Sequence, residues 1–318
     1  MVFQSLCSFM LKNFKSGFVA IIGRPNVGKS TLLNSLVKNK ISIVSKIPQT
    51  TRHNIKGILN LENAQVVFID TPGIHSFKDN LSIYLNNIAK SSIYDVDLIL
   101  YLVDISRPIG KEEMDIMNFL VNQDPKIIMA LNKIDLTKKY ISDYIDKFKE
   151  ILEEKNKQDK LLYYIPISAK TFKNVDVLIK VILETLKEQN PFYDLNTITD
   201  FPIKFRIADI IREKLFLTLK EELPHSLAVE VEDILDRGIL KEDSSKYPIY
   251  IKVNIYVNRI SQKKIVIGDK ASLIKYVGEI ARKDIENLLN RKIYLDIRVK
   301  VLKDWQDKPR ILQELGYF

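Results

Sequence analysis

Short runs of apolar residues alternate with amphipathic stretches through the first 190 residues of the chain. Near-continuous apolar runs are typical of buried parallel strands. They occur at residues 18–22, 65–69, 98–103, 126–131 and 163–167. The amphipathic stretches between them predict helices on both faces of the sheet. The segment IKGILNLENAQVVFI predicts a hairpin that turns near Glu62 and Asn63, which adds an antiparallel strand. The pattern therefore predicts an α/β domain with a mixed, mostly parallel sheet.

The pattern changes near the middle of the chain. Residues 190–200 lose periodicity and contain Pro191, so we expect a linker there, after a domain at 17–189. An α+β domain is predicted at 201–318. Its expected elements are a helix near 207–219, strands near 226–233 and 250–257, a short strand and turn at IVIG, a helix near 271–289 and a final strand KIYLDIRVKV. Residues 1–16 lack a basic n-region and a small-residue cleavage site, so we interpret them as an N-terminal tail.

Composition narrows the class of protein. With 318 residues, 46% of them hydrophobic and 28% charged, the chain can bury a core and does not resemble a disordered or fibrous protein. A net charge of +9 favours a polyanionic partner, either nucleic acid or an anionic membrane surface. The single cysteine, Cys7, excludes an intramolecular disulfide and a cysteine-based zinc site. No apolar run is long enough to span a bilayer, so we expect a soluble, cytoplasmic protein.

The first chemical motif lies between a predicted strand and a predicted helix. It consists of Gly23, Arg24, Pro25, Asn26, Val27, Gly28, Lys29 and Ser30, and Thr31 follows it. Glycines let backbone N–H groups surround phosphates, Lys29 can reach the β and γ oxygens, and Ser30 offers an oxygen to Mg²⁺. The helix N-terminus also favours negative charge. A fortuitous glycine-rich turn is the alternative, but the strand–loop–helix context favours phosphate binding.

A second motif follows the apolar strand QVVFI. It comprises Asp70, Thr71, Pro72 and Gly73, with Ile74 next in the chain. This position is the carboxyl edge of the predicted sheet, where ligands of such sheets bind. We expect Asp70 to hold Mg²⁺ through a water and the Gly73 N–H to sense the γ-phosphate. An isolated Asp-X-X-Gly is a common turn, whereas one placed behind a phosphate loop and a strand favours nucleotide chemistry.

Two motifs at later strand ends identify the base. They are Asn132, Lys133, Ile134 and Asp135, and then Ser168, Ala169 and Lys170. We expect Asp135 to accept two hydrogens from the guanine edge, Lys133 to pack over the base, and the Ala169 N–H to meet the guanine carbonyl. Adenine would leave a buried carboxylate unpaired, which can mean discrimination of about 10⁴ or more. The sequence therefore predicts a guanine nucleotide.

In this order, the motifs resemble the translation-factor-related GTPases. The resemblance makes Gln49, Thr50, Thr51, Arg52 and His53 the switch I segment, in which a threonine binds Mg²⁺ only in the GTP state. Both threonines remain candidates, and we favour Thr51. With Ser30 and Asp70, that threonine would complete the Mg²⁺ ligands.

One position departs from the Ras-like pattern. Ile74 stands where those proteins carry a catalytic glutamine, and an apolar side chain cannot orient water. Resembling GTPases instead use a monovalent cation held by the phosphate-loop asparagine, so K⁺ at Asn26 is an additional expected cofactor. The alternative is that Asn26 only stabilises the loop. The resemblance gives Lys29, Thr51, Gly73 and Asn26 as the catalytic set.

The C-terminal half resembles a KH module. KKIVIGDKASLIKYVGEIARKDIENLLNRKIYLDIRVKV matches the strand, G-X-X-G turn and helix that form a cleft for about four nucleotides of single-stranded RNA. A Ras-like P-loop NTPase domain followed by an α+β, type II KH domain resembles the Era family of bacterial ribosome-assembly GTPases over residues 17–318. The resemblance implies GTP hydrolysis with Mg²⁺. It also implies that the GTP state binds the 3′ end of 16S rRNA and assists assembly of the 30S subunit, without a role for DNA.

The KH turn also departs from the family pattern. It consists of Gly268, Asp269, Lys270 and Ala271, with alanine in place of the final glycine. If that position needs a positive φ, alanine costs about 1 kcal/mol or more. If it already lies in the first helical turn, alanine is harmless. We favour the helical placement, because lysines and arginines keep the site electropositive. These are Lys263, Lys264, Lys270, Lys275, Arg282 and Lys283.

Alternative interpretations remain at a few positions. The basic domain is also compatible with peripheral docking on the cytoplasmic face of the inner membrane. The missing glutamine is compatible with a nucleotide-gated binding protein of negligible turnover. His53 and His75 are interpreted as solvated loop residues rather than catalytic bases. Trp305 is expected either to pack on the second domain or to touch RNA.

Overall fold

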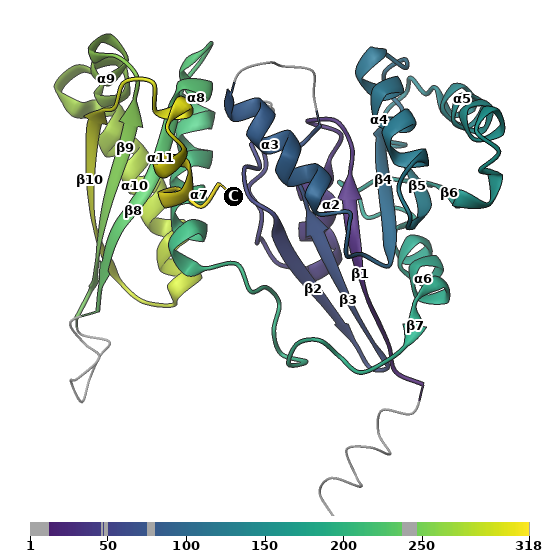
Figure 1. Ribbon diagram of the computed structural model, residues 1–318. Helices are drawn as coiled ribbons and strands as arrows, with labels where there is room; N and C mark the ends of the chain where they lie inside the picture. Colours follow the sequence, from purple (N-terminus) through teal and green to yellow (C-terminus); the bar gives the residue numbers. More distant parts are fainter. Residues whose placement is uncertain (1–12, 46, 48–49, 75–79, 237–246, 318) are drawn as a thin grey trace, which may run out of the picture. The chain divides into compact units, whose positions relative to one another are not determined.

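The computed structural model describes residues 13–45, 47, 50–74, 80–236 and 247–317, and it divides into two compact units (Figure 1). The described residues of Met1–Ser42 and Thr51–Asp200 form the first unit. The described residues of Ile43–Thr50 and Phe201–Phe318 form the second. The described residues between 43 and 50 thus belong to the second unit, although they lie inside the first domain in sequence. No pattern in the sequence predicted that these residues join the second unit.

The first unit is built on a sheet whose strands follow the predicted apolar runs. Its main strands are β1 (Lys15–Ile22), β2 (Ile55–Leu61), β3 (Ala64–Asp70), β4 (Leu98–Asp104), β5 (Lys126–Asn132) and β6 (Leu161–Ile167), in the spatial order β2-β3-β1-β4-β5-β6. Only β2 runs antiparallel along this path, and Leu61 lies opposite Ala64 across the hairpin turn. The predicted mixed, mostly parallel sheet is confirmed.

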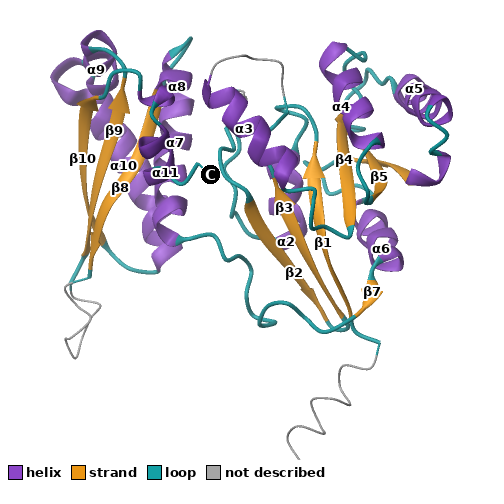
Figure 2. Ribbon diagram, in the orientation of Figure 1, coloured by secondary structure: helices purple, strands orange, loops and turns teal. Residues whose placement is uncertain are grey.

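Helices cover both faces of this sheet, as Figure 2 shows. They are α2 (Lys29–Val37), α3 (Asn80–Ser91), α4 (Lys111–Val121), α5 (Ile141–Glu154) and α6 (Val175–Thr185), with a 3₁₀ turn at Gln158–Lys160. On one face, Met117 of α4 and Phe148 of α5 pack in a fully buried cluster with Tyr101 of β4. Since both faces are covered, the residues that point to either face of the central strands are buried. This burial explains the continuous apolar runs of these strands.

Both ends of the first unit differ from the predicted boundaries. Strand β1 begins at Lys15, within the expected N-terminal tail, and pairs with a short antiparallel strand β7 (Lys187–Glu188). Residues of the expected linker are hydrogen-bonded along the first unit. The Gln65 side chain accepts from the N–H groups of Phe192 and Tyr193 at 2.7 and 3.0 Å. Backbone groups without regular pairing need such partners, so this stretch runs along the sheet as an ordered strap.

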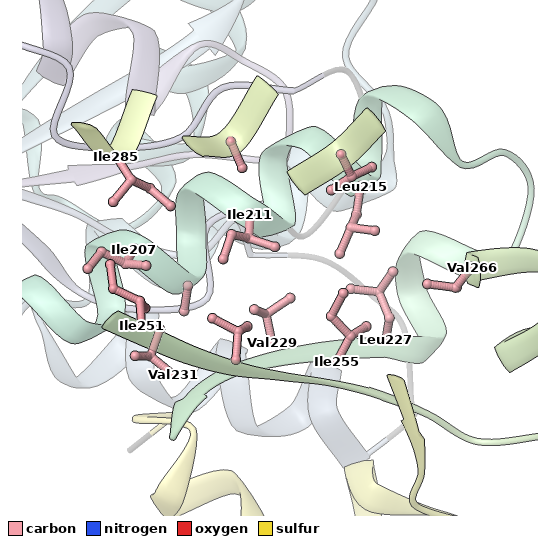
Figure 3. Close-up of a cluster of buried hydrophobic side chains, with 14 of the residues drawn as sticks. Ile207, Ile211, Leu215, Leu227, Val229, Val231, Ile251, Ile255, Val266 and Ile285 are labelled. Carbon is pink, nitrogen blue, oxygen red and sulfur yellow. The ribbon is translucent and has the colours of Figure 1, made fainter. Parts of the chain in front are cut away.

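The second unit contains helices on a three-stranded sheet. Its elements are α7 (Ile203–Thr218), α8 (Leu223–Ser226), β8 (Leu227–Leu235), β9 (Ile249–Val257), α9 (Ile260–Ile267), a 3₁₀ turn at Asp269–Ala271, α10 (Ser272–Leu289), β10 (Ile293–Val301), a 3₁₀ turn at Trp305–Asp307 and α11 (Pro309–Glu314). The order is β10-β9-β8, with β10 parallel and β8 antiparallel to β9. Figure 3 shows Ile211 of α7 facing Val229 of β8 and Ile255 of β9. This is the α+β arrangement expected for the domain.

The prediction of a short strand at IVIG is wrong. Residues 265–267 end helix α9 instead. The side chain of Gln262 accepts from the N–H groups of Asn258 and Arg259 at 2.9 and 3.0 Å, which caps the start of this helix. A four-residue apolar run cannot by itself distinguish a strand from a buried helix segment, and here the cap decides for the helix.

Two packing details complete the second unit. Trp305 is fully buried, and its indole N–H donates to the Ser226 carbonyl at 2.9 Å, so this residue packs within the domain. Val44 and Thr50 are held by α7. Glu213 accepts from the Val44 N–H at 3.2 Å, and Arg212 donates to the Thr50 carbonyl at 3.0 Å. Among the residues that the structure describes, none of the helices is long and apolar enough to cross a lipid bilayer.

Candidate functional site

The predicted phosphate loop runs from the end of β1 into the start of α2. Lys29 is buried, and its ammonium group donates to the carbonyls of Gly23 and Arg24 at 3.0 and 2.9 Å. Burial lowers the pKa of Lys29 to about 8, although the carboxylates of Asp70 and Glu113 oppose that change. A poorly solvated cation at a helix N-terminus is well suited to receive phosphate oxygens.

Two glycines let the backbone segments of the site approach closely. Gly28 has a φ of +107°, and a Cβ there would lie 2.5 Å from the Asn132 amide nitrogen. A Cβ on Gly73 would lie 2.5 Å from the backbone nitrogen of Pro25. The DTPG motif therefore lies directly against the phosphate loop. This proximity is the arrangement that a γ-phosphate sensor requires.

A group of oxygen atoms surrounds the carboxylate of Asp70 at the end of β3. Its Oδ2 accepts from the hydroxyls of Ser30 and Ser42 at 2.7 and 2.8 Å. The hydroxyl of Thr51 lies 2.8 Å from that of Ser30. Thr50 instead donates to the Ile47 carbonyl at 2.6 Å. Of the two candidate threonines, Thr51 is therefore the one beside Ser30.

These oxygens have the chemistry of a magnesium site. Asp70 is fully buried, and burial raises the pKa of its carboxyl, while Lys29 and the neighbouring hydroxyls oppose that change. Within the described residues, its Oδ1 atom has no hydrogen-bond partner. A carboxylate and hydroxyls, without nitrogen or sulfur, fit the preference of Mg²⁺ for oxygen ligands. The sequence did not predict Ser42, because its proximity to Asp70 arises only from the tertiary fold.

Asn132 connects three motifs at the base end of the site. Its side-chain N–H₂ donates to the Val27 carbonyl of the phosphate loop at 2.7 Å. Its Oδ1 accepts from the Ala169 N–H at 2.9 Å. The sequence predicts that this N–H meets the guanine carbonyl, whereas in the structure its acceptor lies within the protein. Strands β5 and β6 are parallel neighbours, so their ends meet at one edge and the amide reaches across.

Lys133 is held by a carboxylate that the sequence analysis did not single out. Its ammonium group lies 2.6 Å from Asp104 at the end of β4 and donates to the Asn26 carbonyl at 3.0 Å. Burial opposes ionisation of Asp104, but hydrogen bonds from Lys133 and Ser106 lower its pKa overall. Asp135 is exposed. The sequence signal for Asp104 was its position directly after an apolar strand, like that of Asp70.

Ile74 and His53 are both at least partly buried. Ile74 is partly buried against the cluster of α4 and α5, and its N–H donates to the Gly23 carbonyl at 3.3 Å. The expectation that His53 is solvated is wrong, because only 5% of it is exposed and the neighbouring Arg52 is fully buried. Gln49 and His75 lie outside the described residues.

The KH turn connects α9 and α10, and its backbone contradicts one expectation. Ala271 does not lie in the first helical turn, because its φ is +61° and it precedes the start of α10. Lys270 also has a positive φ, of 44°, as has Gly268, with 75°. An alanine in this left-handed region costs about 1–2 kcal/mol, so the site carries the strained version of the motif.

Cationic and apolar side chains are exposed on the two helices that this turn connects. Lys264, Lys270 and Lys275 are exposed, and Lys263 is partly exposed. Large apolar side chains on the same two helices are exposed as well. Ile260, Ile265 and Tyr276 have exposed fractions of 68, 52 and 55%. These three are not among the residues predicted from the sequence, where the available signal was an apolar residue on a helix face that the core does not use.

Family models match both halves of the chain. Residues 18–133 match the model described as a 50S ribosome-binding GTPase, and residues 222–306 match a KH domain. Among curated proteins, GTPase Era of Geobacter metallireducens is 42% identical over 311 residues, which cover 96% of this chain and 98% of that protein. GTPase Era of Staphylococcus epidermidis is 41% identical over 303 residues, covering 95 and 97%.

Solved structures show the same full-length similarity. One is Era in complex with MgGDPNP and nucleotides 1506–1542 of 16S ribosomal RNA, with 37% identity, a TM-score of 0.84 and coverage of 96% of this chain and 99% of that one. Another is a tyrosine-to-alanine variant of Aquifex aeolicus Era bound to GDP·AlF₄⁻, with 36% identity, a TM-score of 0.83 and the same coverage. Both domains of this chain are therefore matched together, in one protein.

Proposed function

The chain belongs to the Era family of GTPases, and we propose that it is a GTP-driven switch whose KH domain binds the 3′ end of 16S ribosomal RNA. In this role it assists assembly of the 30S subunit. The observation that carries the proposal is the full-length similarity to the Era complex with MgGDPNP and a 16S RNA segment. The phosphate loop lies within the residues that the GTPase model matches, and the KH turn lies within those that the KH model matches.

GTP hydrolysis follows from the residues around the phosphate loop. The Gly23 and Arg24 carbonyls, which accept from the Lys29 ammonium group, direct it toward the oxygens of the β- and γ-phosphates. Gly73, against the loop, offers its N–H to the γ-phosphate. Backbone donors and Lys29 stabilise the transferring phosphoryl group while a water attacks in line, so no covalent intermediate forms.

Mg²⁺ is the divalent cofactor of this proposal, and Ser30, Thr51 and Asp70 are the residues that would hold it. When bound, it neutralises charge on the phosphate oxygens. The 2.8 Å approach of the Thr51 and Ser30 hydroxyls supports the choice of Thr51 over Thr50. Loss of the γ-phosphate would release Thr51 and Gly73, and with them the two switch segments. The KH domain then changes its hold on RNA.

Potassium is the second proposed cofactor, with the Asn26 amide oxygen as one ligand. The competing explanation is that asparagine is present because Asn26 has a φ of +63°, which this residue type tolerates. Asn26→Gly separates the two, because glycine keeps the backbone and removes the amide. We expect the parent protein to turn over GTP faster in KCl than in NaCl, and the variant to lose that difference while still binding GDP. Equal turnover of the parent in both salts would contradict the potassium site.

RNA binding can be tested with the full chain, a GTP analogue, a 3′-terminal 16S oligonucleotide and a scrambled control. Each removed phosphate contact should lower the salt dependence of binding by about one unit of slope. We therefore expect Lys264→Gln and Lys270→Gln to weaken binding, with exposed Lys139→Gln on the first unit as the matched control. Equal affinity for the scrambled oligonucleotide would leave a GTPase with a different target.

Peripheral docking on the cytoplasmic face of the inner membrane is a second candidate, which the net charge of +9 favours. Flotation with vesicles containing an anionic phospholipid tests it directly. If the protein floats with the vesicles at physiological salt and competing RNA abolishes this flotation, lipid and RNA share the same basic surface. Absence of flotation under these conditions would exclude the membrane role.

A further inference from the structure

A buried ion pair connects the phosphate loop to helix α4. The Nε atom of Arg24 lies 2.6 Å from Oε2 of Glu113, whose side chain is fully buried. Only 16% of the Arg24 side chain is exposed. A buried pair of this kind costs desolvation, so its presence does not by itself indicate stability. Nothing in the phosphate-binding chemistry described above requires it.

The Glu113 carboxylate is anchored on its other side. Tyr101 of β4 donates to Oε1 at 2.5 Å, and Tyr144 of α5 lies 3.4 Å from Oε2. Both tyrosines are fully buried. Glu113 also lies in the first turn of α4, where a negative charge is favourable. The carboxylate is therefore a fixed point, held chiefly by the short Tyr101 hydrogen bond and by its place in α4, whereas the Tyr144 contact is long.

Arg24 directly follows Gly23, and the backbone carbonyls of these two residues hold Lys29. Gly23 supplies one of these acceptors and Arg24 the other. The Gly23 carbonyl also accepts from the N–H of Ile74, which follows the DTPG motif. Pro25 comes next, and a proline restricts the conformation of the residue before it. Fixing the Arg24 side chain therefore fixes the peptide planes on either side of its Cα.

We infer that Arg24 and Glu113 are positioning residues, which set the phosphate-loop carbonyls and through them the direction of the Lys29 ammonium group. The pair acts on the phosphate end of the site only, since the base contacts come from the ends of β5 and β6. The alternative is that it merely attaches α4 to the sheet. The inference rests on the assignment of GRPNVGKS as the phosphate loop, which binding of GDP by the parent protein tests separately.

The experiment compares the affinities of GDP and guanosine, measured by competition with a fluorescent GDP. Arg24→Met keeps the apolar stem, and Glu113→Gln keeps the shape of the side chain while placing an N–H₂ group beside the guanidinium. We expect each to weaken GDP binding by about tenfold and guanosine binding by less than about twofold. Because both changes break one interaction, the double variant should also lose about tenfold.

Tyr144→Phe is the matched control, because it removes the long contact to the same carboxylate and leaves Arg24 paired. It should bind GDP like the parent. Unchanged GDP affinity in the two single variants, parallel losses for GDP and guanosine, or a hundredfold loss in the double variant would overturn the inference. If Glu113→Gln does not fold, Arg24→Met alone still separates the two ligands.

Discussion

Asn132 is the single side chain on which the geometry of the nucleotide site depends most. It is buried, and it satisfies the Val27 carbonyl and the Ala169 N–H, which lie on residues only 1 and 2% exposed. Asn132→Ala leaves both groups without a partner. Each unsatisfied buried group costs about 1–3 kcal/mol, so we expect a loss of about 2–6 kcal/mol in the free energy of unfolding.

Thermal unfolding with and without GDP measures this loss, because the transition that GDP raises belongs to the first unit. For a domain of this size, 1 kcal/mol corresponds to about 2–4 °C, so the midpoint should fall by at least about 4 °C. GDP affinity should fall as well, since the phosphate loop and the Ala169 segment lose their common anchor. Asn122→Ala, at an exposed position at the end of α4, should change stability by less than about 0.5 kcal/mol. An Asn132→Ala protein that melts within 1 °C of the parent would refute this reasoning.

Three further changes have defined outcomes. Thr51→Ala should raise the Mg²⁺ concentration needed for GTP hydrolysis several-fold, whereas Thr50→Ala should not; kinetics at varied Mg²⁺ that show the reverse order would exchange the two roles. Gly28→Ala should abolish detectable GDP binding in calorimetry, because a Cβ 2.5 Å from an amide nitrogen adds to the strain of a φ of +107°. In the second unit, Lys252 and then Asn254 lower the pKa of Glu232 from 4.5 to about 2. The stability this contributes is present above pH 4.5 and lost as the pH falls to about 2, so Glu232→Gln should flatten the acid-unfolding curve there.

The sheet of the first unit and the motifs at its edge could be predicted from the sequence because both depend on local patterns. Strands buried on both faces read as continuous apolar runs, and each motif directly follows such a run. Parallel order then brings Asp70 and Asn132 to the same edge. Their tertiary partners could not be predicted, since Ser42 and Asp104 acquire their roles only from the packing of separate segments.

Other features were missed because the sequence pattern was ambiguous or silent. The IVIG run is too short to define an element, and its helix depends on the cap supplied by Gln262. Alanine usually favours a helix, so its propensity pointed away from the left-handed conformation of Ala271. The association of residues 43–50 with the second unit depends on contacts with Arg212 and Glu213, which lie far away in sequence. Propensity and spacing carry no information about contacts of that kind.

A GTP-driven switch on ribosomal RNA is tested most directly by the affinity of the full chain for the 3′-terminal 16S oligonucleotide, once with GDPNP and once with GDP. We expect tighter RNA binding with GDPNP than with GDP. By linkage, the RNA should tighten the binding of GDPNP relative to that of GDP by the same factor. A factor of about 5–150 would be ordinary for coupled sites. Equal affinities in the two nucleotide states, with GTP hydrolysis intact, would contradict a GTP-driven switch on ribosomal RNA.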